Sequence, residues 1–170
     1  DVFNSRKSND MVLRTFLNFE IDSFSGEKKP IFTEYRVGDR VIHIENNYNM
    51  LCFYHKLGTT FQLLSDKQGV MNGDVGKILG FYLGSDLVFV DEYGDEDKAT
   101  RDSFANDSKI VYLAVNYEGI NSKGQEITYT VFYRGEIIDI PEFNSLSIKD
   151  KCYIVESSDL KKLELAYALT

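Results

Sequence analysis

Residues 73–78, Gly-Asp-Val-Gly-Lys-Ile, place a lysine directly after a glycine turn, as nucleotide-binding loops do. In a Walker A loop four residues separate the two glycines, and a Ser or Thr that binds Mg²⁺ follows the lysine. Here only two residues separate Gly73 from Gly76, and Ile78 stands at the Mg²⁺ position. Asn72-Gly73 is instead a strong hairpin signal, because a tight type I′ turn needs positive φ angles. The sequence therefore predicts a hairpin here and no nucleotide site.

Metal and nucleophile chemistry has little support. His43 and His55 have no cysteine or carboxylate at a metal-ligand spacing, and a lone histidine on a strand is usually structural. The Gly-x-Ser-x-Gly nucleophile elbow is absent. Cys52 and Cys152 lie far apart, outside any metal-ligand pattern, and are expected to be free thiols.

Acidic residues are plentiful but do not form a recognisable site. The run 91–97 has its glycine at position four instead of six, and Asp102 stands where a calcium loop needs a bidentate Glu. Residues 91–108 are therefore predicted to be a solvated, mobile loop. Nothing in the spacing of the later carboxylates, at Glu126, Glu136, Asp139 and Glu142, singles out an acid–base pair. The sequence predicts no catalytic residue, no metal and no cofactor within the chain.

Basic and polar side chains gather at the turns of two short motifs, residues 35–48 and 70–81. Asparagine can hydrogen-bond a phosphate or a base edge, and tyrosine can stack on an unpaired base. One interpretation is therefore a nucleic-acid contact. In the other, the two asparagines satisfy the backbone of their own turn and the tyrosine packs on the domain. The candidate DNA-binding residues here, with Arg36 beside them, are Arg40, Asn46, Asn47, Tyr48 and Lys77.

The 170 residues carry a formal net charge of −8. Proteins that hold nucleic acid unaided usually present a basic face, because Lys and Arg release the counterions of the phosphates. The acidic balance therefore argues against stand-alone DNA binding. No apolar run reaches the roughly 18–20 residues that span a bilayer, and residues 1–7 lack the apolar segment of a secretory signal. We expect a cytoplasmic chain that does not bind a membrane.

Short apolar runs separated by Gly, Asn and Asp predict at least eight strands, among them residues 51–55, 59–64, 75–83, 109–117 and 126–134. Residues 10–19 carry apolar side chains at helical spacing behind a possible Asn or Asp cap, and are predicted to be a short N-terminal helix. Because no helices alternate with the strands, the predicted fold class is mainly β, a small and strongly curved β-barrel.

The order of these motifs resembles the C-terminal region of RecD-like ATP-dependent DNA helicases of superfamily 1B, the exodeoxyribonuclease V alpha type. That family reads Leu-Asn, then Tyr-Arg-Val-Gly-Asp-Lys-Val, Asn-Asn-Tyr and Val-hydrophobic-Asn-Gly-Asp-hydrophobic-Gly. It closes with Asp-Leu and with Leu-Glu-Leu-Ala-Tyr-Ala-hydrophobic-Thr. The matching segments of this chain are, in order, 17–18, 35–40, 46–48, 70–76, 159–160 and 163–170.

The resemblance implies an elaborated SH3-like barrel, the 2B domain, over residues 35–160, with inserts near 49–69 and 91–148. Residues 1–34 and 161–170 would then be the edges of motor domain 2A. Thr170 matches a family residue placed at the DNA backbone. The chain would reach single-stranded DNA through its parent helicase and contact the remaining motor domains, which would hold ATP and Mg²⁺.

A second hypothesis is an independent SH3-like module that binds a protein or RNA partner and hydrolyses nothing. The chain starts without Met and stops within an apolar segment. These ends fit either a piece of a longer protein or a trimmed complete domain.

Overall fold

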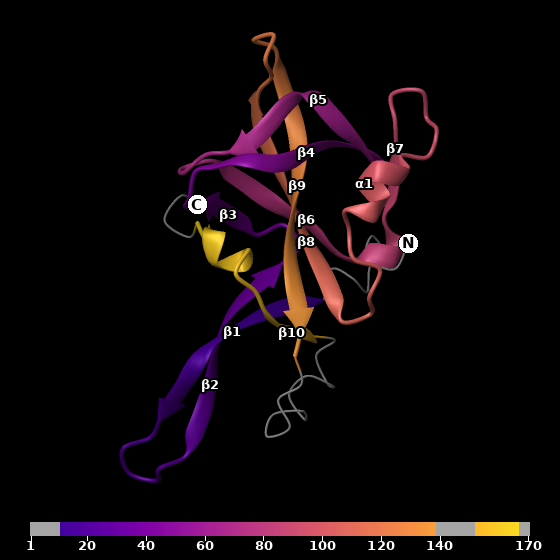
Figure 1. The fold of residues 1–170 in the computed structure, drawn as a ribbon. Coiled ribbons are helices and arrows are strands. Elements are labelled where there is room, and N and C mark those ends of the chain that lie inside the picture. The colour runs from indigo at the N-terminus through magenta and orange to yellow at the C-terminus, as the bar shows by residue number, and fades with distance from the viewer. Residues whose placement is uncertain (1–10, 139–151, 167–170) are drawn as a thin grey trace.

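The computed structural model describes residues 11–138 and 152–166, and it is mainly β (Figure 1). Strands hold 62% of the described residues and helical turns 8%, so the predicted class is confirmed. The strands are β1 (Val12–Ile21), β2 (Lys28–Arg36), β3 (Arg40–His43), β4 (Asn47–Leu57), β5 (Thr60–Val70), β6 (Val75–Leu83), β7 (Val88–Val90), β8 (Ile110–Ile120), β9 (Glu126–Ile137), β10 (Cys152–Glu156) and β11 (Leu163–Leu165). The helical elements are η2 (Gly84–Asp86), α1 (Lys98–Asp102) and η4 (Leu160–Lys162).

The strands form one open sheet in the order β11-β3-β6-β8-β9-β10-β1-β2, with β4, β5 and β7 as a branch. The predicted closed barrel is therefore wrong: in the described parts of the chain, no ladder joins the end strands β11 and β2. The cause lies at β9, the long central strand of Figure 1. One edge of β9 pairs with β8, while the other is divided between β4 at Thr130 and β10 at Glu136 and Ile137. The sheet forks at this edge instead of closing.

The N-terminal helix predicted over residues 10–19 is also wrong, because β1 occupies most of this stretch. β1 pairs with β2 along its whole length and with β10 from Val12 to Thr15. Its β-branched and aromatic residues suit a pleated surface, and pairing on both sides outweighs the helical spacing of the apolar positions. Figure 1 shows β1 and β2 projecting from the body as a long hairpin.

The hairpin predicted at Asn72-Gly73 is wrong. A turn does form there, closed by the Asp74 N–H donating to the Met71 carbonyl at 3.0 Å, but the flanking strands β5 and β6 do not pair with each other. The predicted loop 91–108 contains a short helix. Within the predicted loop 91–108, the Asp97 carboxylate caps α1 by accepting the Thr100 N–H at 3.1 Å. Phe104 then packs on the core beneath.

The β8–β9 pair is buried on both faces, and the two faces differ in chemistry. Because alternate residues of a strand point to opposite faces, Tyr117, Tyr129 and Tyr133 share one face. Phe132 lies on the other, with its ring 4.9–5.3 Å from those of Phe53, Phe61 and Phe104. One core layer is therefore polar and rich in tyrosine, and the other is a dry aromatic cluster.

Candidate nucleic-acid interface

Three segments far apart in the sequence meet as neighbouring strands. β3, from the first motif, lies between β6, from the second motif, and β11, near the C-terminus. The Ala166 N–H donates to the Arg40 carbonyl at 2.9 Å, and the Ile44 N–H donates to the Lys162 carbonyl at 2.8 Å. The two motifs and the C-terminal segment therefore form one continuous backbone unit.

Two of the predicted contact residues are brought together by this pairing. Arg40 and Lys77 are cross-strand partners of β3 and β6, and both side chains are exposed. Directly opposed residues place their Cβ atoms about 5 Å apart on one face, so this surface presents two adjacent positive charges. Arg36 is paired with Glu34 at 3.1 Å. Thr170 lies outside the described residues.

The two asparagines have structural partners. Asn46 Oδ1 accepts the Asn72 N–H at 2.9 Å, which ties the turn of the first motif to that of the second. Asn47 binds the His43 ring through Oδ1 at 2.6 Å and the Glu45 carboxylate through Nδ2 at 2.8 Å. Tyr48, in contrast, is 66% exposed, which does not fit the interpretation that it packs on the domain. Asn46 and Tyr48 are both exposed and Asn47 is half-buried, but Tyr48 has no structural role in the contacts described.

A chain of hydrogen bonds runs from Asn47 into the tyrosine layer. His43 is fully buried, with Nδ1 3.0 Å from the Tyr133 hydroxyl, which lies 2.6 Å from that of Tyr117. Because the Asn47 amide nitrogen donates to Glu45, its oxygen faces His43, and His43 Nε2 must carry the proton. Neutral Nδ1 then accepts from Tyr133, whose oxygen accepts from Tyr117. Every donor in this series of hydrogen bonds has an acceptor when His43 is neutral.

Burial is the main cause that lowers the pKa of His43 below its ordinary value. The hydrogen bond to Asn47 opposes this effect, Lys162 adds to it, and the Asp74 and Glu45 carboxylates oppose it. A proton on Nδ1 would also reverse the tyrosine hydroxyls and leave Tyr117 without its acceptor. The structure therefore holds His43 in its neutral form.

We expect this neutral His43 to make the protein less stable in mild acid. Below the ordinary pKa of about 6.5 the unfolded chain binds a proton that the folded chain refuses, so the free energy of unfolding falls as the pH drops. One group contributes a slope of at most about 1.4 kcal/mol per pH unit. Urea unfolding at pH 8 and pH 5.5 should give a larger loss for the wild type than for His43→Gln. Equal losses would contradict the prediction, since His55 and the carboxylates are common to both proteins.

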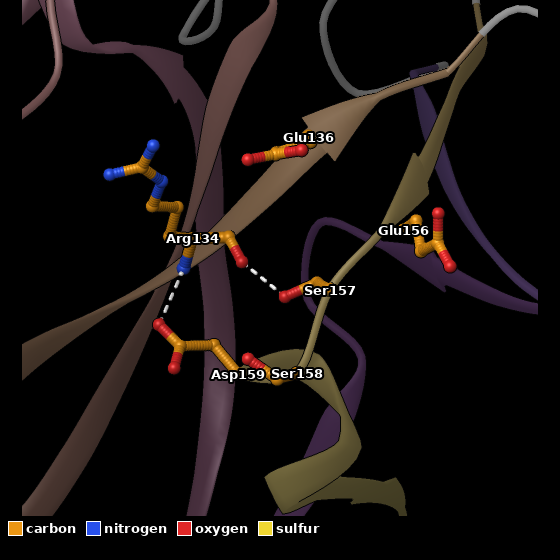
Figure 2. Close-up of a pocket in the computed structure, with 6 residues that line it drawn as sticks. All are labelled: Arg134, Glu136, Glu156, Ser157, Ser158 and Asp159. Carbon is orange, nitrogen blue, oxygen red and sulfur yellow. Dashed lines mark hydrogen bonds between the residues drawn. The ribbon is translucent and has the colours of Figure 1, made fainter.

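No side chain activated as a nucleophile is found in the described parts of the chain. Burial raises the pKa of the Cys52 thiol to about 11, so it is not a thiolate at neutral pH. Figure 2 shows a surface cavity of about 320 Å³ lined by the carboxylates of Glu136 and Glu156. The Ser157 hydroxyl in this cavity donates to the Arg134 carbonyl and accepts the Leu160 N–H. Its hydrogen-bonding capacity is therefore already used by backbone groups. In residues 11–138 and 152–166, no group of three or more His, Cys, Asp or Glu could hold a metal ion.

The sequence did not reveal the buried tyrosines that support the candidate interface. Tyr117 stacks on Tyr129 with centroids 5.5 Å apart, and the Lys67 amino group lies 4.7 Å from the Tyr129 ring centre. That amino group also donates to the Gly69 carbonyl at 3.0 Å. The available signal was Tyr129 and Tyr133, which stand four residues apart in one predicted strand and therefore face one side of the sheet.

Comparison with family models, with curated proteins and with solved structures found no match to the chain. Among the described residues, no helix is long and apolar enough to cross a membrane.

Proposed function

We propose that the chain is a non-catalytic accessory segment of an ATP-dependent 5′→3′ DNA helicase, with an open, SH3-like version of the 2B domain. It would guide single-stranded DNA and couple it to the motor. ATP and Mg²⁺ would be held by the remaining motor domains of the same protein. The proposal takes its function from the resemblance of the motifs to RecD-like helicases.

One observation carries the proposal. Three of the six segments that bear the resemblance contribute to β3, β6 and β11, which are adjacent strands although more than a hundred residues separate the first from the last. Asn46 and Asn72, each from one motif, are joined by a hydrogen bond. Scattered matches of chance origin have no reason to assemble into one unit, whereas parts of one site must.

The geometry suggests a division of labour within this unit. Arg40 and Lys77 would pair with consecutive phosphates, and the exposed Tyr48 ring would stack on a base. Asn46 and Asn47 would act as positioning residues that hold the two turns. With a chain charge of −8, most of the affinity for DNA would come from basic surfaces of the other domains.

The proposal is tested by ATP hydrolysis in the complete gene product. We expect a thymidine oligonucleotide to stimulate hydrolysis strongly, and the isolated 170-residue chain to show none. Arg40→Gln with Lys77→Gln should raise the oligonucleotide concentration for half-maximal stimulation about tenfold. It should also flatten the salt dependence: each single-strand phosphate contact contributes about 0.7 to the slope of log K against log salt, so about 1.4 should be lost.

The matched control is Lys109→Gln with Lys123→Gln, which removes the same charge from exposed lysines elsewhere. An unchanged salt slope in the Arg40 and Lys77 variant would exclude those contacts. A gene product whose ATP hydrolysis is not stimulated by DNA would contradict the helicase proposal. The second hypothesis, an independent binding module, would then remain.

A further inference from the structure

A second cavity, of about 290 Å³, opens over the dry aromatic layer. Its floor is made by Phe53, Tyr112 and Phe132, which are 1%, 5% and 8% exposed. Phe104 forms a wall, with its ring 5.0 Å from Tyr112 and nearly perpendicular to Phe132 at 88°. Leu51 stands at the rim and is 38% exposed. Since small-molecule sites usually begin near 300 Å³, the volume suits a single ring system.

The rim of this aromatic pocket is positively charged, although the chain as a whole is acidic. Arg134 and Lys162 line it with a single carboxylate, Asp159. Asp159 is already engaged: it accepts the Arg134 N–H at 3.1 Å and lies 3.3 Å from the Lys162 amino group. In Figure 2 the Arg134 side chain points away from Glu136 and Glu156. No hydrogen bond or ion pair of its guanidinium is found within the described part of the chain.

Phe53, Tyr112 and Phe132 are nearly buried, so the aromatic ring open to a ligand is that of half-buried Phe104. A partly exposed ring next to a guanidinium is a combination that can hold an unpaired base and its phosphate, because rings stack on bases and Arg pairs with phosphate oxygens. The pocket also adjoins the candidate interface. Leu51 lies three residues beyond Tyr48 on the same strand, and the Lys162 carbonyl accepts the Ile44 N–H at 2.8 Å.

We propose that the aromatic pocket binds one unpaired nucleobase of single-stranded DNA, with Arg134 on the adjoining phosphate. This inference rests on the proposed function for the identity of the ligand. It adds a base-binding subsite built mainly by β4, β9 and the segment after α1, with Asp159 as the one lining residue from a motif that resembles a helicase.

The test is a titration of the ¹⁵N-labelled 170-residue chain with a short thymidine oligonucleotide, followed by amide resonances. The oligonucleotide concentration is taken high enough to detect weak binding, because the other domains are expected to supply most of the affinity. We expect the resonances of Phe104 and Phe132 to shift, and an oligonucleotide with abasic sites to bind about tenfold more weakly. Equal binding of the abasic oligonucleotide, or no shift at the pocket, would overturn the proposal.

Variants separate the pocket from the basic pair. Leu51→Asp places a carboxylate at a rim position that is 38% exposed and should weaken binding about tenfold. Arg134→Gln should do the same, and it tests the pocket even if Leu51→Asp does not fold. Lys123→Gln, of equal charge change, should not. If these variants bind normally while Arg40→Gln with Lys77→Gln does not, the pocket proposal fails and the proposed function stands. If the pocket binds the base but the gene product hydrolyses no ATP, only the helicase proposal fails.

Discussion

Gly76→Ala should lower the free energy of unfolding by about 3 kcal/mol, although it adds one methyl group. A Cβ on Gly76 would lie 2.6 Å from Val115 Cγ1, 2.7 Å from the Asn116 carbonyl oxygen and 2.9 Å from Tyr117 Cδ1. Overpacking costs about 1–3 kcal/mol where side chains can move aside, and a backbone oxygen in the β6–β8 ladder cannot. For a chain of this size, the melting temperature should fall by about 10 °C, as measured by thermal denaturation.

The control is Gly124→Ala, at a glycine with φ of +76° and nothing within 4 Å. That substitution carries only the backbone cost of a left-handed residue, about 1–2 kcal/mol. We therefore expect Gly76→Ala, whose position has no special φ, to be the more damaging of the two. The reverse order would mean that β6 and β8 lie further apart than the structure places them.

Part of the fold could be predicted from the sequence alone. The alternation of apolar residues and the glycine turns predicted strands at 51–55 and 59–64. β4 contains the first and β5 contains the second from Thr60 onward, with Gly58 between them at φ +58°. Those signals are local. Whether a sheet closes depends on which edge of β9 each partner takes, and that is decided by contacts between residues such as Phe53 and Thr130, far apart in the chain.

The same limit applies to the candidate interface. The turn signals placed Arg40 and Lys77 near the start of two strands, and antiparallel pairing made them neighbours. The asparagines could not be assigned in this way, because their partners are the Asn72 backbone and the ring of a buried histidine. The spacing of residues in the sequence cannot distinguish a side chain that stabilises a turn from one that is available to bind a ligand.

Tyr133→Phe should lower the free energy of unfolding by about 3 kcal/mol. The Tyr133 hydroxyl donates to His43 Nδ1 and accepts from Tyr117, so its loss leaves two buried polar groups without partners. Each such group costs about 1–3 kcal/mol. Tyr117→Phe removes only the terminal donor and should cost about 1 kcal/mol. Tyr93→Phe, at a residue 82% exposed, should change the free energy of unfolding by less than about 0.5 kcal/mol.

The double variant tests whether the hydrogen bonds from Tyr117 through Tyr133 to His43 act as one connected network. Once Tyr133 is phenylalanine, the Tyr117 hydroxyl is a buried donor with no acceptor, and removing it relieves that cost. Tyr117→Phe should then stabilise the Tyr133→Phe protein by about 1 kcal/mol, although it destabilises the wild type. Urea unfolding of the four proteins gives a coupling energy of about 2 kcal/mol in this cycle. Additive effects within about 0.5 kcal/mol would show that the two hydroxyls act separately, and the direction assigned to the bonds from Tyr117 to His43 would be wrong.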